Sequence, residues 1–151
     1  MTASEVEAPS QTLFGLVAPL LSAGREDTPV ASSDGLTLTV KVYASGGENA
    51  LHAHPGEDHS FVVLAGSARF EFGDSTTADL GVYDGVLLPR GTFYKFQSTG
   101  AENLVMLRAG APVDGPAWDR IAPDKKEMPA DSEANKHVPA VRIPGKYFGR
   151  P

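Results

Sequence analysis

A two-residue alternation of apolar and polar side chains runs through the middle of the chain. In residues 36–43, LTLTVKVY, leucine and valine alternate with threonine, lysine and tyrosine. This period is typical of a half-buried β-strand, because successive side chains of a strand point to opposite faces. Further short apolar segments follow as far as residue 109, separated by turn sequences such as SGGEN and STGAEN. Seven or eight short strands in about 75 residues predict an all-β sandwich or barrel.

The segment before this region has a different spacing. In residues 13–21, LFGLVAPLL, the leucines and the valine recur as they would on one face of a helix. Gly15 and Pro19 interrupt that face, and a proline removes a helical hydrogen bond. We therefore expect residues 13–21 to form a short helix or a docking segment, after a flexible tail over residues 1–12.

The alternation ends after Gly110. Residues 111–151 hold seven of the twelve prolines, and AVRIP is the one strand-like piece among them. A segment of this length without regular structure is either disordered or packed on something, and its apolar side chains favour packing. These side chains are Trp118, Ile121, Val141, Ile143, Tyr147 and Phe148. The expected organisation is a barrel with its docking segment over residues 13–110, followed by a long, irregular, proline-rich C-terminal arm over residues 111–151.

Composition excludes several classes of protein. A chain of 151 residues suits one domain, and the absence of cysteine leaves only nitrogen and oxygen ligands for a metal. The formal net charge is -6 and the basic residues cluster only at Lys125 and Lys126, which argues against a nucleic-acid partner. Glu5 and Glu7 stand where a secretory signal would be basic, and no apolar run approaches the roughly 18 residues of a membrane span. We therefore expect a cytoplasmic protein with no membrane partner.

Three of the four histidines fall within ALHAHPGEDHSFVVLAG, residues 50–66. On a strand, His52 and His54 point to the same face, and a turn at PGED lets His59 on the next strand point back at them. Three imidazoles from two adjacent strands suit one divalent metal at about 2.0–2.1 Å and leave coordination positions open, as catalytic sites do. The alternative is a hydrogen-bonded core pair that binds no metal.

The same stretch resembles the first motif of the cupin superfamily, His-x-His, three or four residues, Glu, six residues, Gly. YDGVLLPRGTFYKF resembles the second motif, Pro-x-Gly, two residues, His. His59 stands at the glutamate position and Tyr94 at the last histidine position, so the usual three histidines and a glutamate become three histidines and a phenol. Two motifs in the correct order are more specific than one. The resemblance covers roughly residues 36–109 and implies a double-stranded β-helix, or jelly-roll barrel, with a metal in its mouth.

Tyr94 and Glu57 are the candidate catalytic residues. The phenol of Tyr94 has a reference pKa of about 10, so we favour a hydrogen bond to a metal-bound water or substrate oxygen over direct ligation. Its alternative role is to fill the space of a lost ligand. Glu57 could orient an imidazole or act as a general base, or with Asp58 it could belong to a solvated turn. His137, in the arm, is expected at the surface and not as a ligand.

These residues lead to a functional hypothesis with alternatives. The resemblance implies an enzyme that uses one divalent ion, Fe, Zn, Ni or Mn, on a small oxygenated molecule with a carboxylate, enol or carbonyl group. Proteins of this kind include dioxygenases, lyases, isomerases and cyclases, and the fold does not choose among them. The alternatives are a module that binds a small ligand without catalysis and a purely structural barrel. We also expect a homodimer in which the N-terminal segment and the arm cover sheet surface.

Overall fold

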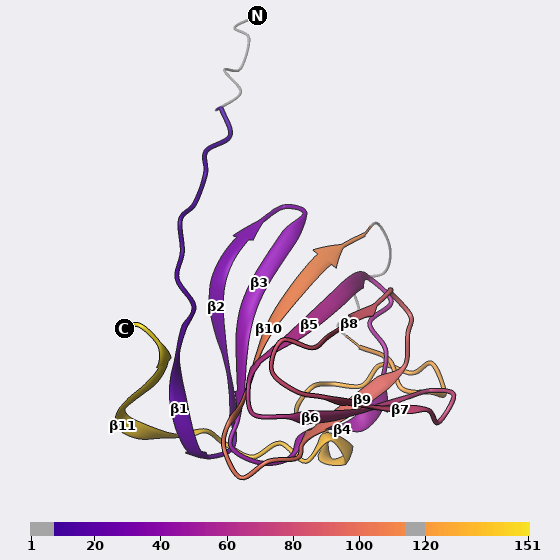
Figure 1. Ribbon diagram of the computed structural model, residues 1–151. Helices are drawn as coiled ribbons and strands as arrows, with labels where there is room; N and C mark the ends of the chain where they lie inside the picture. The colour runs from indigo at the N-terminus through magenta and orange to yellow at the C-terminus, as the bar shows by residue number, and fades with distance from the viewer. Residues whose placement is uncertain (1–7, 114–119) are drawn as a thin grey trace, which may run out of the picture.

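The protein is nearly all β-structure in the computed structural model, which describes residues 8–113 and 120–151 (Figure 1). Trp118 lies outside the described residues. No helix in the described parts is long and apolar enough to cross a membrane. The strands are β1 (Val17–Ala23), β2 (Arg25–Ser33), β3 (Leu36–Tyr43), β4 (Gly47–His52), β5 (Glu57–Ala65), β6 (Ala68–Phe72), β7 (Thr77–Leu80), β8 (Gly85–Leu88), β9 (Tyr94–Ser98), β10 (Leu104–Pro112) and β11 (Val141–Gly149).

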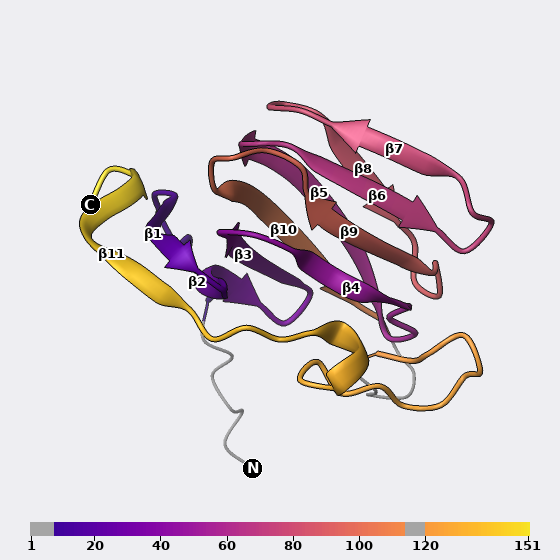
Figure 2. The ribbon, with the colours of Figure 1, turned by 90° about the horizontal axis from the view of Figure 1, so that it is seen from below.

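Two antiparallel sheets face each other and enclose the core. The five-stranded sheet has the order β2-β3-β10-β5-β8 and the four-stranded sheet the order β4-β9-β6-β7. Figure 2 shows the four-stranded sheet lying across the other sheet, with the β1–β11 ribbon beside them. Side chains from both sheets fill the interior: Tyr43, Phe61, Val63, Ala68, Phe70, Leu88, Tyr94, Phe96, Leu104 and Met106. The predicted all-β, two-sheet barrel is confirmed.

Strand β3 is more buried than its alternation predicts. Val40 and Val42 pack on the outer side of the sheet, in a second apolar cluster. Thr39, Lys41 and Tyr43, on the opposite side, are buried as well. The expected half-buried strand therefore has both faces covered over residues 39–43, with its polar face toward the barrel interior.

Residues 13–21 do not form a helix, so that prediction is wrong. From Val17 onward the segment belongs to β1, which pairs with β11, a strand more than a hundred residues away, whereas residues 13–16 have no regular structure. Ala18 and Leu21 of β1 are fully buried against the outer apolar cluster of β3 and β10. Docking is thus correct for this segment, but the helical spacing is misleading, because a distant partner strand supplies hydrogen bonds that favour an extended backbone. β2, whose sequence REDTPVASS shows no alternation, is likewise stabilised by pairing with β3.

The C-terminal arm packs on its own barrel. Ile121 pairs with Ala53 through backbone hydrogen bonds, and a short 3-10 turn, η1 (Glu133–Asn135), buries Asn135 near β4. The arm is also less irregular than expected, because β10 continues to Pro112 and the AVRIP piece extends to a nine-residue strand. Its side chains on β11 remain largely exposed.

Candidate metal and substrate site

The three clustered histidines lie at the connection between β4 and β5. His52 is the last residue of β4, His54 follows two residues later, and His59 is the third residue of β5. The expected PGED turn is shorter, because Glu57 and Asp58 already belong to β5. The two strands are not neighbours in one sheet, as the sequence suggests, but belong to opposite sheets. The imidazoles therefore meet across the barrel interior.

The structure brings together the four positions singled out in the two motifs. The ring centroids of His52 and His54 are 5.1 Å apart, and those of His54 and His59 are 4.3 Å apart. Tyr94 begins β9 opposite His52, with ring centroids 4.5 Å apart, and its hydroxyl lies 3.3 Å from Nε2 of His54. All four side chains are buried.

In two of the imidazoles, one ring nitrogen makes a hydrogen bond and the other ring nitrogen has no partner among the described residues. Nδ1 of His52 donates to the Ala50 carbonyl oxygen at 2.7 Å, and Nε2 of His59 donates to Glu57 at 2.7 Å. Both partners are acceptors, so these nitrogens carry the proton and the opposite nitrogens carry a lone pair. Nε2 of His52 and Nδ1 of His59 are buried and have no hydrogen-bond partner among the described residues. A buried lone pair without a donor is costly unless a ligand uses it.

Burial keeps His52 and His59 neutral near pH 7. Burial and the nearby charge of Arg120 together lower the pKa of His52 to about 4, outweighing the hydrogen bond to Ala50. Burial also lowers the pKa of His59, although the hydrogen bond that His59 donates to Glu57 opposes that change. Neutral imidazole is the form that binds metals.

The imidazoles do not form a ready-made metal site as they lie. Within residues 8–113 and 120–151, no group of three or more histidine, aspartate or glutamate side chains is arranged to hold a metal ion. The chemistry of the donors nevertheless fits a divalent metal, because each unpartnered nitrogen belongs to an imidazole whose other nitrogen is bound to a carbonyl or carboxylate oxygen. The histidine site therefore suits a divalent metal in the type and burial of its donor atoms, but not in their arrangement.

Glu57 contacts the site, whereas Asp58 does not. The carboxylate of Glu57 is about two-fifths exposed and bonded to His59, an arrangement expected for an orienting role and not for a freely solvated turn. Asp58 accepts a hydrogen bond from the Arg90 backbone at 2.7 Å and so ties β5 to the loop after β8. His137 lies on the surface as expected, with Nδ1 3.4 Å from Nε of Arg25.

The structure contains a buried charged cluster next to the histidines that the sequence does not predict. Glu48 of β4 contacts Arg120 at 2.8 Å, Lys41 at 3.4 Å and the Tyr43 hydroxyl at 3.0 Å. Asn135 contacts the same carboxylate at 3.4 Å. The one sequence feature that points to this cluster is Lys41, which occupies a polar position in the alternating pattern of β3. Arg120 and Asn135 could not be linked to Glu48, because they are 72 and 87 residues away from it in the sequence.

Two cavities open beside these groups. One, of about 510 Å³, lies between the β2–β3 hairpin and the start of β5 and is lined by Thr37, Thr39, Glu57, His59 and Arg108, together with β2 residues. The other, of about 340 Å³, lies above the Glu48 cluster and also reaches Arg108. Arg108 therefore stands between the two cavities.

Sequence comparison finds a family that is similar to the barrel. Residues 39–109 match the family described as Cupin domain. Over 52 residues the chain is 40% identical to the uncharacterized protein YdbB of Bacillus subtilis (strain 168). This match covers 34% of the present chain and 46% of YdbB, so it spans less than half of that relative.

Several solved structures have the same fold as the barrel. The conserved protein with a double-stranded β-helix domain from Klebsiella pneumoniae is 20% identical with a TM-score of 0.54, covering 62% of this chain and 81% of its own. The cupin domain of Cnp3 from Schizosaccharomyces pombe is 18% identical with a TM-score of 0.54, covering 59% and 65%. KdgF from Halomonas sp. is 20% identical with a TM-score of 0.54, covering 60% and 82%. These likenesses show that the barrel has the double-stranded β-helix fold, and the match to the Cupin domain family covers residues 39–109.

Proposed function

We propose that this protein is a metal-dependent cupin enzyme that acts on a small oxygenated molecule carrying a carboxylate, enol or carbonyl group. In this proposal His52, His54 and His59 bind one divalent metal ion. The observation that carries it is the pair of buried, unpartnered ring nitrogens, Nε2 of His52 and Nδ1 of His59. Since no three donors are yet arranged around one point, binding must include adjustment of the imidazole side chains.

The chain's own residues support this use of the site. The Ala50 carbonyl and the Glu57 carboxylate fix the rings of His52 and His59 and keep a lone pair on the opposite nitrogen. Tyr94 places its hydroxyl at Nε2 of His54, where it can donate to a substrate oxygen at the site. A bound divalent metal would supply Lewis-acid polarisation of that oxygen.

The metal content of the purified protein tests the proposal. We expect about one equivalent of divalent metal in protein purified without added metal, and less than about a tenth of that in the double variant His52→Ala/His54→Ala, because only neutral imidazoles serve as its nitrogen ligands. The measurement is elemental analysis by mass spectrometry, with circular dichroism to check the fold.

Two variants serve as matched controls. His137→Ala removes a histidine from the surface and should keep the full equivalent of metal. Tyr94→Phe removes only a hydroxyl and should also keep its metal, since the proposal gives the phenol a role toward substrate. Stoichiometric metal in the double histidine variant would refute the ligand assignment, and loss of metal in Tyr94→Phe would make Tyr94 a ligand.

A substrate screen with and without oxygen separates the reaction classes. Oxygen uptake that depends on a small carboxylate, enol or carbonyl compound would support a dioxygenase. Turnover that is equal under anaerobic conditions would support a lyase, isomerase or cyclase. Tight binding without turnover in either condition would support the alternative of a non-catalytic ligand-binding module.

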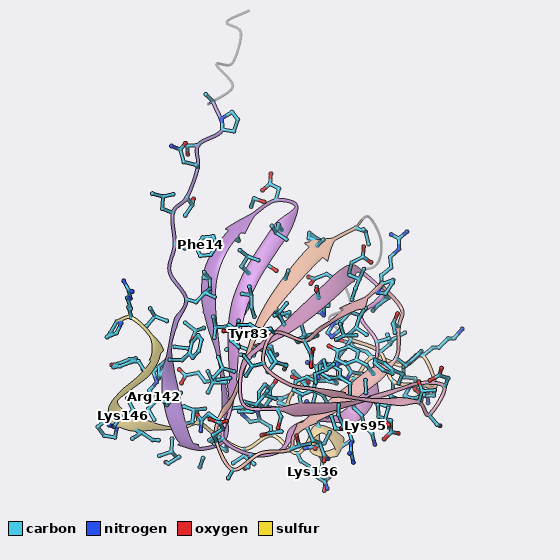
Figure 3. All side chains as sticks on the ribbon, in the orientation of Figure 1. Phe14, Tyr83, Lys95, Lys136, Arg142 and Lys146 are labelled. Atoms are coloured by element: carbon cyan, nitrogen blue, oxygen red, sulfur yellow. The ribbon has the colours of Figure 1, made fainter. Side chains whose placement is uncertain are left out.

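We also propose that the protein forms a homodimer through the β1–β11 ribbon. Because the arm packs on its own barrel, the support for a dimer comes from the free edge and the exposed apolar side chains of the β1–β11 ribbon. β11 pairs only with β1 in the described parts of the chain, and it exposes Val141, Ile143 and Tyr147. Figure 3 shows Arg142 and Lys146 on this ribbon at the edge of the molecule. A free antiparallel edge strand is self-complementary about a two-fold axis.

Light scattering at micromolar concentration tests this association. We expect a particle of twice the 15.9 kDa chain mass for the natural sequence and a monomer for Val141→Lys/Ile143→Lys, because two added charges oppose edge pairing. Leu87→Lys, at the far edge of the five-stranded sheet, is the control and should remain dimeric. A 15.9 kDa particle for the natural sequence would refute the dimer.

A further inference from the structure

Arg108 occupies an unusual place for a cation. It lies on β10, the central strand of the five-stranded sheet, between Thr39 of β3 and Phe61 of β5 in the strand register. Both neighbours are buried, and Arg108 itself is half-buried on the side of the sheet that faces the barrel. A guanidinium at this position loses part of its hydration, which costs free energy unless an acceptor replaces the water.

The described parts of the chain do not supply that acceptor. Nε of Arg108 is buried and has no hydrogen-bond partner. None of the ion pairs found among residues 8–113 and 120–151 includes Arg108. The other two interior cations differ, because Lys41 and Arg120 both pair with Glu48. Arg108 thus offers a charged, directional donor to whatever enters the barrel.

The space in front of Arg108 has the size of a small molecule. The cavity of about 510 Å³ is lined by the hydroxyl-bearing Thr37 and Thr39 and reaches His59. Figure 1 shows the upper ends of β2, β3 and β10 extending beyond the four-stranded sheet. The lining residues of the cavity come from these three strands and from β5. Gly110 lies against two of the lining side chains, since a Cβ there would lie 2.8 Å from Oγ1 of Thr37 and 2.9 Å from Oε2 of Glu57.

We propose that this cavity binds a small molecule through a carboxylate group held by the Arg108 guanidinium, with the remainder of the molecule directed toward His59. The planar fork of arginine matches the two oxygens of a carboxylate. Among the described residues, Arg108 is the one unpaired cation that faces the cavity, while the carboxylate of Glu57 is bonded to His59, so a single negative charge fits better than the double charge of phosphate. The idea that the bound molecule reacts at the histidines rests on the proposed function, but the contact with Arg108 does not require a metal.

Calorimetric titration with pyruvate and lactate, which each carry a single negative charge, tests the proposal, with pyruvamide, lactamide and inorganic phosphate as comparison ligands. We expect both carboxylates to bind the natural protein at least tenfold more tightly than their uncharged amides and more tightly than phosphate. Arg108→Gln should weaken carboxylate binding at least tenfold, and Arg108→Lys should weaken it less because the charge remains. Arg69→Gln removes the same charge from the exposed face of β6 and should leave the affinity unchanged.

The results separate this proposal from the metal assignment. Carboxylates that bind Arg108→Gln and the natural protein equally, or amides or phosphate that bind as tightly as the carboxylates, would overturn the proposal whatever the metal content. Carboxylate binding that depends on Arg108, in protein that is purified without any metal, would support the carboxylate site and refute only the proposed metal. If Arg108→Gln does not fold, Gly110→Ala decides. The added methyl group must displace the lining side chains of Thr37 and Glu57 and should weaken pyruvate binding at least several-fold, and an unchanged affinity would overturn the proposal.

Discussion

Replacing Glu48 with alanine is expected to lower the free energy of unfolding by about 3–5 kcal/mol. The carboxylate is only 5% exposed and lies 2.8 Å from Arg120 and 3.4 Å from Lys41, both of which are buried. Removing it deprives two buried cations of their buried counter-charge, which is much more costly than losing a surface pair. Because Arg120 and Asn135 reach this carboxylate from the arm, we also expect the arm to detach more readily.

Urea unfolding followed by circular dichroism measures this loss. Glu71→Ala is the matched control, since Glu71 pairs with Lys95 at 3.4 Å on the surface and its removal should cost about 1 kcal/mol or less. Equal stabilities for Glu48→Ala and Glu71→Ala would show that the buried cluster does not hold the arm on the barrel.

The acid profile of the isosteric substitution Glu48→Gln gives an independent measure. Burial by itself would raise the pKa of Glu48, but the charges of Lys41 and Arg120 outweigh burial and hold that pKa well below its usual value of 4.5. The unfolded chain therefore takes up this proton at a higher pH than the folded protein does. The stabilisation is complete above pH 4.5 and is lost as the pH falls through the folded pKa, so the stability gap between the natural protein and Glu48→Gln should narrow in acid. A gap that widens in acid would contradict the assignment.

Leu21→Ala is expected to cost about 2–5 kcal/mol of unfolding free energy. Leu21 is 1% exposed and packs with Val40, Val42 and Val105 on the outer side of the barrel. The Asn103 side chain also binds both backbone groups of Leu21, at 2.8 and 2.9 Å, so the strand cannot shift easily to fill the cavity left by the substitution. The loss should therefore lie well above that of an ordinary surface substitution.

Leu13→Ala provides the matched control for this measurement. Leu13 lies in the same N-terminal segment but is 92% exposed, so its replacement should change stability by no more than about 0.5 kcal/mol. Urea unfolding of the three proteins gives the comparison. A Leu21→Ala variant as stable as Leu13→Ala would mean that β1 contributes little to the core.

The barrel could be predicted from the sequence because the alternating pattern that indicates its strands lies in residues close together along the chain. Alternation in residues 36–43 and in the segments that follow predicts strands, and strands with this period need a second sheet to cover them. The histidine pair is local in the same sense, since His52 and His54 are two residues apart, and the turn that returns the chain to His59 lies directly after them. The motif spacing in turn predicts that Tyr94 joins them, as the structure shows.

The errors arose where distant segments compete with local preference. The helix-like spacing of residues 13–21 loses to pairing between β1 and β11, because a ladder of hydrogen bonds to another strand outweighs weak helical propensity already interrupted by Gly15 and Pro19. The arm gains its order in the same way, from Ala53, from Glu48 and from β1. None of these partners lies near it in the sequence.

The sequence by itself therefore determined the fold class, the strand at residues 36–43 and the histidine-rich stretch, since each depends on residues close together along the chain. Only the tertiary structure decided that β4 and β5 belong to opposite sheets, that Glu57 bonds to His59, and that Lys41 and Arg108 lie on the inward side of the five-stranded sheet. The physical reason is that charge burial depends on what covers a strand face. An alternating pattern distinguishes two faces, but the packing of the second sheet and the arm determines which face becomes the interior of the barrel.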